Sequence, residues 1–148
     1  MTNNSYAPFS RTRDDWETPD DFFQDLDREF HFGLDVCATK DNAKCENFFS
    51  PKQDGLKQNW WGYGTVWCNP PFGRQVGSWV KKAVEESDRG VTTVMLLPAR
   101  VDTAWFHDYC YRKENVDIRF LRGRLKFKWA SYNSPFPIMI IIFKGETT

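Results

Sequence analysis

Thr65-Val66-Trp67-Cys68-Asn69-Pro70-Pro71-Phe72-Gly73 is the stretch of the sequence that decides the fold. Its first four residues carry the β-branched, aromatic and small apolar side chains that favour a buried strand. The two prolines cannot donate to a strand ladder, so the strand must end at Asn69. A polar side chain followed by a stiff turn is therefore expected at the carboxyl end of a core strand.

Further strands and helices are expected on both sides of this stretch. Apolar runs predict strands over residues 32–38, 45–49, 91–97, 116–121 and 137–143, and helical spacing predicts helices over 76–87 and 103–111. Another helix is predicted to begin at Thr18-Pro19, with Thr18 as its cap. Strands that alternate with helices indicate an α/β open sheet with mostly parallel strands.

The length of 148 residues suits one domain with one core. We expect a flexible segment over residues 1–13 and a folded domain over 14–148. The sequence shows neither a signal peptide nor a membrane-spanning apolar run, so a cytoplasmic location is expected. The four Cys and two His lack metal-ligand spacing, so neither a zinc site nor a disulfide framework is expected.

The formal net charge is zero, but the charges are unevenly distributed. Residues 1–73 carry 7 basic and 12 acidic side chains, a net charge of −5, and residues 74–148 carry 13 basic and 8 acidic, a net charge of +5. Such asymmetry fits a second half that faces a polyanion, although solvated faces give the same count.

A basic run with interleaved aromatic residues occupies positions 119–129, and it could contact phosphates or be a strand with a solvated charged face. Residues 128–136 are a candidate recognition loop. The candidate nucleic-acid contacts are Arg74, Arg100, Arg122, Arg124 and Lys126.

Ligands of open α/β sheets bind beyond the carboxyl ends of the strands. Asp35, the turn over 69–72 and Pro98-Ala99-Arg100 each lie at the carboxyl end of a predicted strand. These three features are therefore expected to meet at one edge of the sheet. Each also has a purely structural explanation, since the turn could serve only to end its strand and Asp35 could be a cap or an ion-pair partner.

Asn69-Pro70-Pro71-Phe72 resembles the (D/N/S)-P-P-(Y/F/W) motif of amino-methyltransferases. The segment LDVCA (34–38) resembles the cofactor motif of phage-type members, although Thr39-Lys40-Asp41 stands where the wider family has glycines. Trp16-x-Thr18-Pro19, Asp54-x-Leu56 and the segments 96–100 and 122–127 fit the same pattern. From Trp16 to Phe143 the chain resembles the phage-encoded DNA N6-adenine methyltransferase (Dam-like) family.

This resemblance implies a single-domain, Rossmann-like fold of S-adenosylmethionine-dependent methyltransferases. It has a mostly parallel sheet, an antiparallel C-terminal strand and no separate target-recognition domain. The implied reaction transfers a methyl group from S-adenosylmethionine to the N6 amine of adenine in DNA, with the base flipped out or already single-stranded. The implied catalytic residues are Asn69, Pro70, Pro71 and Phe72, and no metal is needed.

The residue types of the turn suit that chemistry. The Asn69 side-chain oxygen and a proline carbonyl can accept the hydrogens of the amine, which frees the lone pair of its nitrogen. Phe72 offers a flat face on which a base can stack. By resemblance, the cofactor contacts are Trp16, Thr18, Pro19, Asp35, Cys37, Ala38, Asp54, Leu56 and Asn69.

Among these contacts, Asp35 would favour the cationic methionine end of the cofactor, Thr18-Pro19 would contact the same moiety, and Asp54 would bind the cofactor adenine. Two alternatives remain open at this stage. The chain could be a catalytically silent module that binds S-adenosylmethionine or DNA as a decoy, or it could methylate RNA or protein amide groups. The sequence leaves open whether the chain is a monomer or a homodimer.

Overall fold

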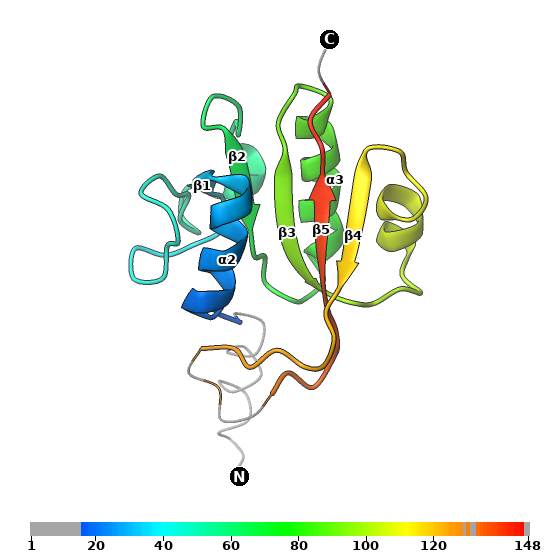
Figure 1. Cartoon of the computed structure of the whole chain (residues 1–148). Coiled ribbons are helices and arrows are strands. Elements are labelled where there is room, and N and C mark those ends of the chain that lie inside the picture. The colour runs from blue at the N-terminus through cyan, green and yellow to red at the C-terminus, as the bar shows by residue number, and fades with distance from the viewer. Residues whose placement is uncertain (1–15, 129, 131–132, 147–148) are drawn as a thin grey trace.

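A five-stranded sheet with one long helix on each face forms the computed structural model of the chain (Figure 1). The structure describes residues 16–128, 130 and 133–146. The expected flexible segment 1–13 lies outside these residues. The elements are α2 (Asp20–Phe30), β1 (Phe32–Asp35), η1 (Gly55–Lys57), β2 (Thr65–Cys68), α3 (Val76–Ser87), β3 (Thr93–Pro98), η2 (Phe106–Cys110), β4 (Val116–Phe120) and β5 (Ile138–Phe143).

The strand order is β1-β2-β3-β5-β4. β1, β2 and β3 pair in parallel, and β5 runs antiparallel to both of its neighbours, β3 and β4. The expectation of a mostly parallel α/β sheet with an antiparallel C-terminal strand is therefore confirmed, and the architecture is consistent with a Rossmann-like methyltransferase fold.

Alternating side chains of the central strands fill two apolar layers. Val94 and Leu96 of β3 face the layer that contains Phe23 and Leu26 of α2. The intervening Met95 and Leu97 face the layer that contains α3 and η2. Because β3 and β5 are buried along their whole length, these two strands form the centre of the core.

Two strand predictions need correction near β1. The run over 32–38 forms a strand only to Asp35, because the Asp35 carboxylate accepts the backbone N–H of Cys37 and the chain turns there. The run over 45–49 forms no strand, and only an isolated bridge joins Phe48 to Asp35. Cys37 and Ala38 of the first segment, which follow β1, line the cavity described below.

Two helix predictions also differ in detail. The helix predicted over 103–111 is mainly the π-helical turn η2 over 106–110. The N-cap position of α2 belongs to Pro19 rather than to Thr18, with no side-chain cap. The Thr18 hydroxyl instead bonds a residue of the turn after β2. The helix predicted over 76–87 and the strand predicted over 65–68 agree with α3 and β2.

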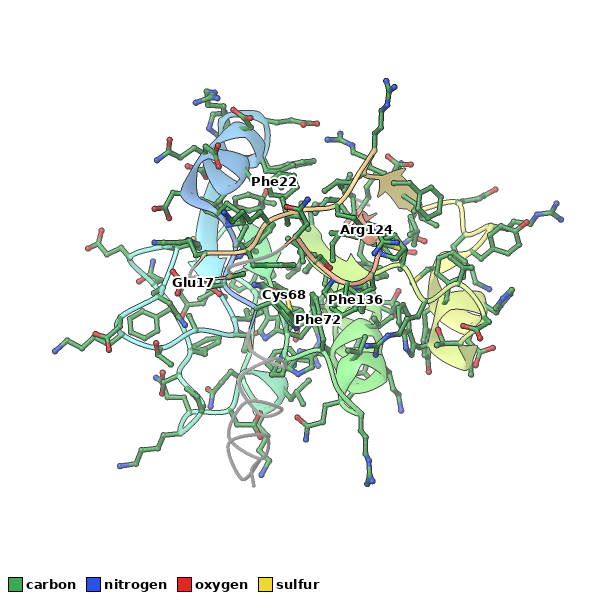
Figure 2. The ribbon with its side chains drawn as sticks, turned by 90° about the horizontal axis from the view of Figure 1, so that it is seen from below. Glu17, Phe22, Cys68, Phe72, Arg124 and Phe136 are labelled. Carbon is green, nitrogen blue, oxygen red and sulfur yellow. The ribbon has the colours of Figure 1, made fainter. Side chains whose placement is uncertain are left out.

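The fold gathers four connections at one end of the sheet. The carboxyl ends of β1, β2, β3 and β4 all point toward the lower end in Figure 1, where the described parts of the connection between β4 and β5 (121–128, 130 and 133–137) lie beneath them. Figure 2 views this end directly, with Phe72 beside Phe136. Among the described residues, no helix is both long and apolar enough to span a bilayer.

Candidate active site

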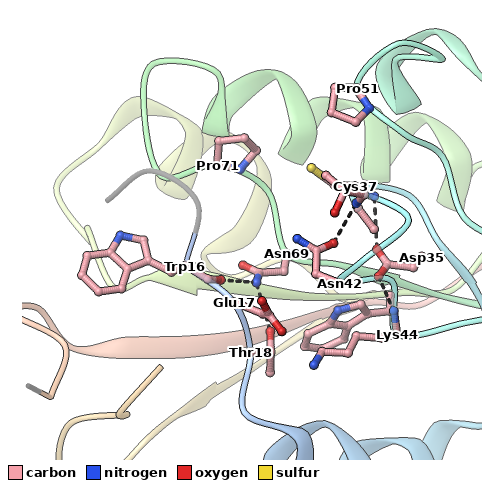
Figure 3. A pocket seen from close by; sticks show the side chains of 13 residues that line it. Trp16, Glu17, Thr18, Asp35, Cys37, Asn42, Lys44, Pro51, Asn69 and Pro71 are labelled. Atoms are coloured by element: carbon pink, nitrogen blue, oxygen red, sulfur yellow. Dashed lines mark hydrogen bonds between the residues drawn. The ribbon is translucent and has the colours of Figure 1, made fainter. Parts of the chain in front are cut away.

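A cavity of about 170 Å³ opens between the segment 16–18 and the carboxyl ends of β1 and β2 (Figure 3). Its walls come from parts of the chain far apart in sequence, which the parallel pairing of β1 and β2 brings together. The lining residues are Trp16, Glu17, Thr18, Asp35, Cys37, Ala38, Thr39, Asn42, Lys44, Pro51, Trp67, Asn69 and Pro71.

The side-chain amide of Asn69 has a fixed orientation in this cavity. Its Nδ2 donates to the backbone oxygen of Trp16 at 2.5 Å and to Oγ1 of Thr18 at 3.0 Å. A backbone carbonyl can only accept, so the amide nitrogen must face Trp16 and the oxygen must face away. Oδ1 is buried and has no hydrogen-bond partner in the part of the chain that the structure describes. An unpaired buried acceptor is costly, which makes this oxygen a candidate for binding a donor of a ligand.

The carboxylate of Asp35 stands at the end of β1 on another wall of the cavity. Its side chain is 2% exposed, and it accepts the backbone N–H groups of Cys37 at 3.2 Å and Lys44 at 3.0 Å. Burial raises the pKa of Asp35 to about 6, against the lowering effect of these hydrogen bonds and of the Lys44 charge. A cationic ligand beside this carboxylate would offset its loss of hydration.

The segment 16–18 joins the turn after β2 to the long connection between β4 and β5. It holds Asn69 by the two hydrogen bonds described above, and the backbone oxygen of Glu17 accepts the N–H of Lys128 at 2.9 Å. The Trp16 ring packs 5.1 Å from the ring of Phe127, between centroids. The segment therefore ties the cavity to the basic connection.

The other residues of the turn lie in different environments. Pro71 lines the cavity, and its carbonyl accepts the N–H of Gly73 at 3.0 Å. The Phe72 ring is 4% exposed and lies outside the lining, with edge contacts to Phe127 at 6.0 Å and Phe136 at 5.6 Å. In this conformation the Phe72 ring is buried beside two other aromatic rings.

Three residues predicted to contact the cofactor lie outside the lining. Pro19 caps α2, and Asp54 accepts the N–H of Leu56 at 3.1 Å at the start of η1. η1 approaches β1 closely, because Gly55 packs where an added Cβ would lie 2.1 Å from the carbonyl oxygen of Val36. The roles of Pro19, Asp54 and Leu56 stay predictions.

The basic run over 119–128 divides into paired and unpaired side chains. Arg119 forms two hydrogen bonds with Glu29, and Lys128 forms ion pairs with Glu17 and Asp20. Residues 121–128 follow β4 as an irregular connection, so the alternative of a charged strand face applies only to Arg119.

The five predicted nucleic-acid contacts are all exposed. Arg100 lies over the Phe136 ring at 5.8 Å, and Arg124 donates to the backbone oxygen of Ser134. No ion pair involves them within the described residues. The predicted recognition loop 128–136 lies partly outside those residues. The exposed set is Arg74, Arg100, Arg122, Arg124 and Lys126.

Sequence reasoning missed several residues of the cavity wall. Asn42 and Lys44 lie in the polar turn after β1, which looked like a simple connection. The Lys44 Nζ donates to Oδ1 of Asp20 in α2 at 2.8 Å. These residues are 24 positions apart, so no local sequence pattern predicts the contact. Glu17 and Trp67, by contrast, adjoin motifs that the sequence did single out.

The sequence profile of the family described as DNA N-6-adenine-methyltransferase (Dam) matches residues 7–143. The chain belongs to this family. The match spans nearly the whole chain and includes the turn after β2, the end of β1 and the basic connection. The expected family resemblance is thereby confirmed.

Two phage proteins illustrate the relationship to other Dam-family members. The chain is 41% identical over 96 residues to a DNA N-6-adenine-methyltransferase of Escherichia phage T1, covering 64% of this chain and 40% of that protein. It is 34% identical over 118 residues to a protein of the same name from Haemophilus phage HP1, covering 78% of this chain and 66% of that protein. The chain thus spans less than two thirds of the length of each.

The family implies a methyl donor of the S-adenosylmethionine type, and the cavity suits such a group. It offers a buried carboxylate for a cation and an unpaired amide oxygen on another wall. Within the described residues, no group of three or more His, Cys, Asp or Glu side chains is placed to hold a metal ion.

The raised pKa of Asp35 predicts a pH dependence of stability. Its pKa is about 6 in the fold and 3.8 for an ordinary Asp. Between these values the folded chain keeps a proton that the unfolded chain has lost. The free energy of unfolding should therefore fall by about 3 kcal/mol as the pH rises through this window, and this contribution should be constant above it.

Urea denaturation of the wild type and of Asp35→Asn between pH 3.5 and 7 (roughly the titration window) measures this effect. The Asn side chain does not titrate, so the difference between the two proteins isolates Asp35 from the other carboxylates. A difference that stays constant across the window would contradict the prediction.

Proposed function

We propose that this chain transfers a methyl group from S-adenosylmethionine to the N6 amine of adenine in DNA. The observation that carries the proposal is the orientation of Asn69, whose buried Oδ1 has no partner among the described residues. The names of the two phage relatives support the same substrate. When bound, S-adenosylmethionine supplies an activated methyl group on a positively charged sulfur.

The protein's own groups act on the target amine. The lone pair of an adenine amine is delocalised into the ring, so the nitrogen is a weak nucleophile. Oδ1 of Asn69 accepts one hydrogen of the amine and a proline carbonyl accepts the other. We assign this role to Pro70, because within the described residues no backbone N–H donates to its carbonyl, whereas the Pro71 carbonyl accepts that of Gly73. Two acceptors draw the nitrogen toward tetrahedral geometry, and positioning supplies much of the rate.

Asp35 and the aromatic residues complete the proposed site. The Asp35 carboxylate attracts the cationic end of the donor and so sets which way the donor lies. A base inside a duplex cannot reach Asn69, so the target adenine must be extruded or single-stranded. Stacking of that base on Phe72 requires Phe136, which is only partly buried, to move away from the ring.

The substitution Asn69→Ala tests the proposed catalytic turn. Loss of the acceptor should lower the rate of methyl transfer by roughly a hundredfold or more, as for loss of other oriented polar groups in active sites. Methyl transfer from radiolabelled S-adenosylmethionine to unmodified DNA measures the rate, and calorimetry measures binding of the donor, which should change much less than the rate. Asn59→Ala, an exposed Asn before β2, is the matched control.

Two outcomes would contradict the proposal in different ways. An active wild type whose rate survives Asn69→Ala would show that the turn is not catalytic. A wild type that binds the donor without methylating DNA would support a decoy, or a methyltransferase acting on RNA or protein amides. Mapping the methylated position on labelled DNA separates adenine N6 from other sites.

The substitution Thr18→Val tests whether Thr18 positions Asn69. Valine keeps the shape but removes the acceptor of the 3.0 Å hydrogen bond, so the amide of Asn69 should turn more freely. We expect kcat to fall about tenfold, because a tenfold change corresponds to the net free energy of about one hydrogen bond. The Kd of the donor should change little. Thr18→Ser should restore kcat. A raised Kd with unchanged kcat at saturating donor would instead assign Thr18 to cofactor binding.

The unpaired cations of the connection after β4 should bind DNA phosphates. Arg122→Ala combined with Lys126→Ala should weaken binding to every DNA sequence alike and reduce the slope of log Kd against log salt by about two. Fluorescence anisotropy at several salt concentrations measures both quantities. Lys81→Ala, an exposed lysine on α3, is the control, and an equal loss in that variant would contradict the assignment.

A further inference from the structure

β4 is an edge strand whose outer side has no partner strand in the described part of the chain. It pairs with β5 over all five residues, Val116 to Phe120, without a bulge. Sheet edges are commonly blocked by prolines, bulges or very short strands, because an open edge can pair with another chain. The regular edge of β4 carries no proline and no bulge.

Hydrogen bonds at the two ends of β4 reveal which residues face outward. The N–H of Leu121 donates to the Ile138 oxygen at 3.1 Å, and the N–H of Lys144 donates to the Asn115 oxygen at 2.8 Å. In an antiparallel pair, such residues alternate along the strand. Residues 115, 117, 119 and 121 therefore point their backbone groups toward β5, while residues 116, 118 and 120 point theirs away from the sheet.

The side chains of β4 divide by the same alternation. Arg119 lies on the α2 face, where it bonds Glu29 at 2.8 and 2.5 Å, and Asp117 lies on the same face, where it pairs with Lys144 at 3.4 Å. Val116 and Ile118 pack against the core on the α3 face. Phe120 follows them on that face but is 62% exposed, and nothing in the functional site explains so exposed a ring.

We propose that β4 pairs with β4 of a second copy of this chain as antiparallel strands, around a two-fold axis at Ile118. In this register, Ile118 of one copy exchanges two hydrogen bonds with Ile118 of the other. The N–H of each Phe120 donates to the carbonyl of Val116 in the other copy. All four donors and acceptors are among the outward groups found above.

The side chains of two β4 strands complement each other when the strands pair in antiparallel orientation. The same register sets Asp117 opposite Arg119 of the other copy twice, on one face of the joined sheet. On the other face it sets the exposed Phe120 ring against Val116 of the other copy. Opposite charges and apolar pairs in these positions stabilise sheets, whereas an unrelated strand would match neither face. This self-complementarity favours a second copy over other occupants.

A five-residue strand pair buries less surface than a standard interface, so the dimer should be weak and concentration-dependent. Sedimentation equilibrium of the full chain measures its Kd. The substitution Asp117→Lys places a lysine opposite Arg119 of the other copy, and Arg119→Glu places a glutamate opposite Asp117 of the other copy. Each variant alone should weaken the dimer at least about tenfold, because both charge pairs become repulsive.

The decisive experiment mixes the Asp117→Lys and Arg119→Glu variants and measures their association. In a mixed dimer, the introduced lysine of one copy meets the introduced glutamate of the other, and the remaining Arg119 meets the remaining Asp117. Association should therefore return to near the wild-type Kd. The proposal fails if the wild type stays monomeric up to about 1 mM, where even very weak pairing is visible. It also fails if both variants dimerise as the wild type does, or if the mixture associates no better than its components.

Hydrogen exchange of the wild type gives a second measurement that needs no variant. The backbone N–H groups of Ile118 and Phe120 should exchange more slowly as protein concentration rises. Those of Asp117 and Arg119, which bond β5 in either state, serve as internal controls and should not change. Concentration-independent exchange at Ile118 and Phe120 would overturn the proposal. Neither experiment depends on methyl transfer, so both stand apart from the proposed function.

Discussion

The site depends on the two acceptors that hold the amide nitrogen of Asn69. The Trp16 carbonyl and the Thr18 hydroxyl occupy both hydrogens of Nδ2, and this leaves the oxygen as the only group of the side chain free to meet a ligand. A single hydrogen bond would allow the amide to rotate. The strand β2 ends at Cys68, and two prolines follow Asn69, so the backbone is as constrained as the side chain.

The electrostatics of the cavity follow from the same architecture. Parallel strands end together, so Asp35 at the end of β1 and Asn69 directly after β2 share one cavity. Burial of Asp35 costs hydration that two backbone N–H groups only partly replace, hence its raised pKa. The cavity thus places the Asp35 carboxylate, which suits a cationic methyl donor, near the neutral Oδ1 of Asn69, which suits an uncharged amine.

Local sequence was sufficient to predict the framework of strands and helices. The strand over 65–68 and the helix over 76–87 were predictable because apolar spacing and prolines act within a few residues. The strand ending at Asp35 was overestimated, because the side chain of Asp35 itself turns the chain. The place of Lys44 in the cavity wall and the burial of Phe72 could not be predicted, because they depend on contacts with Asp20, Phe127 and Phe136, which are distant in sequence.

The two hydrogen bonds that orient the Asn69 amide also have a consequence for folding. The two acceptors stand 51 and 53 positions earlier in the chain than Asn69. In the same short segment, the backbone oxygen of Glu17 accepts the N–H of Lys128. Residues this distant in sequence meet only when long loops close, and closing such loops costs conformational entropy. The orientation of the Asn69 amide is therefore a property of the folded chain and not of the turn itself.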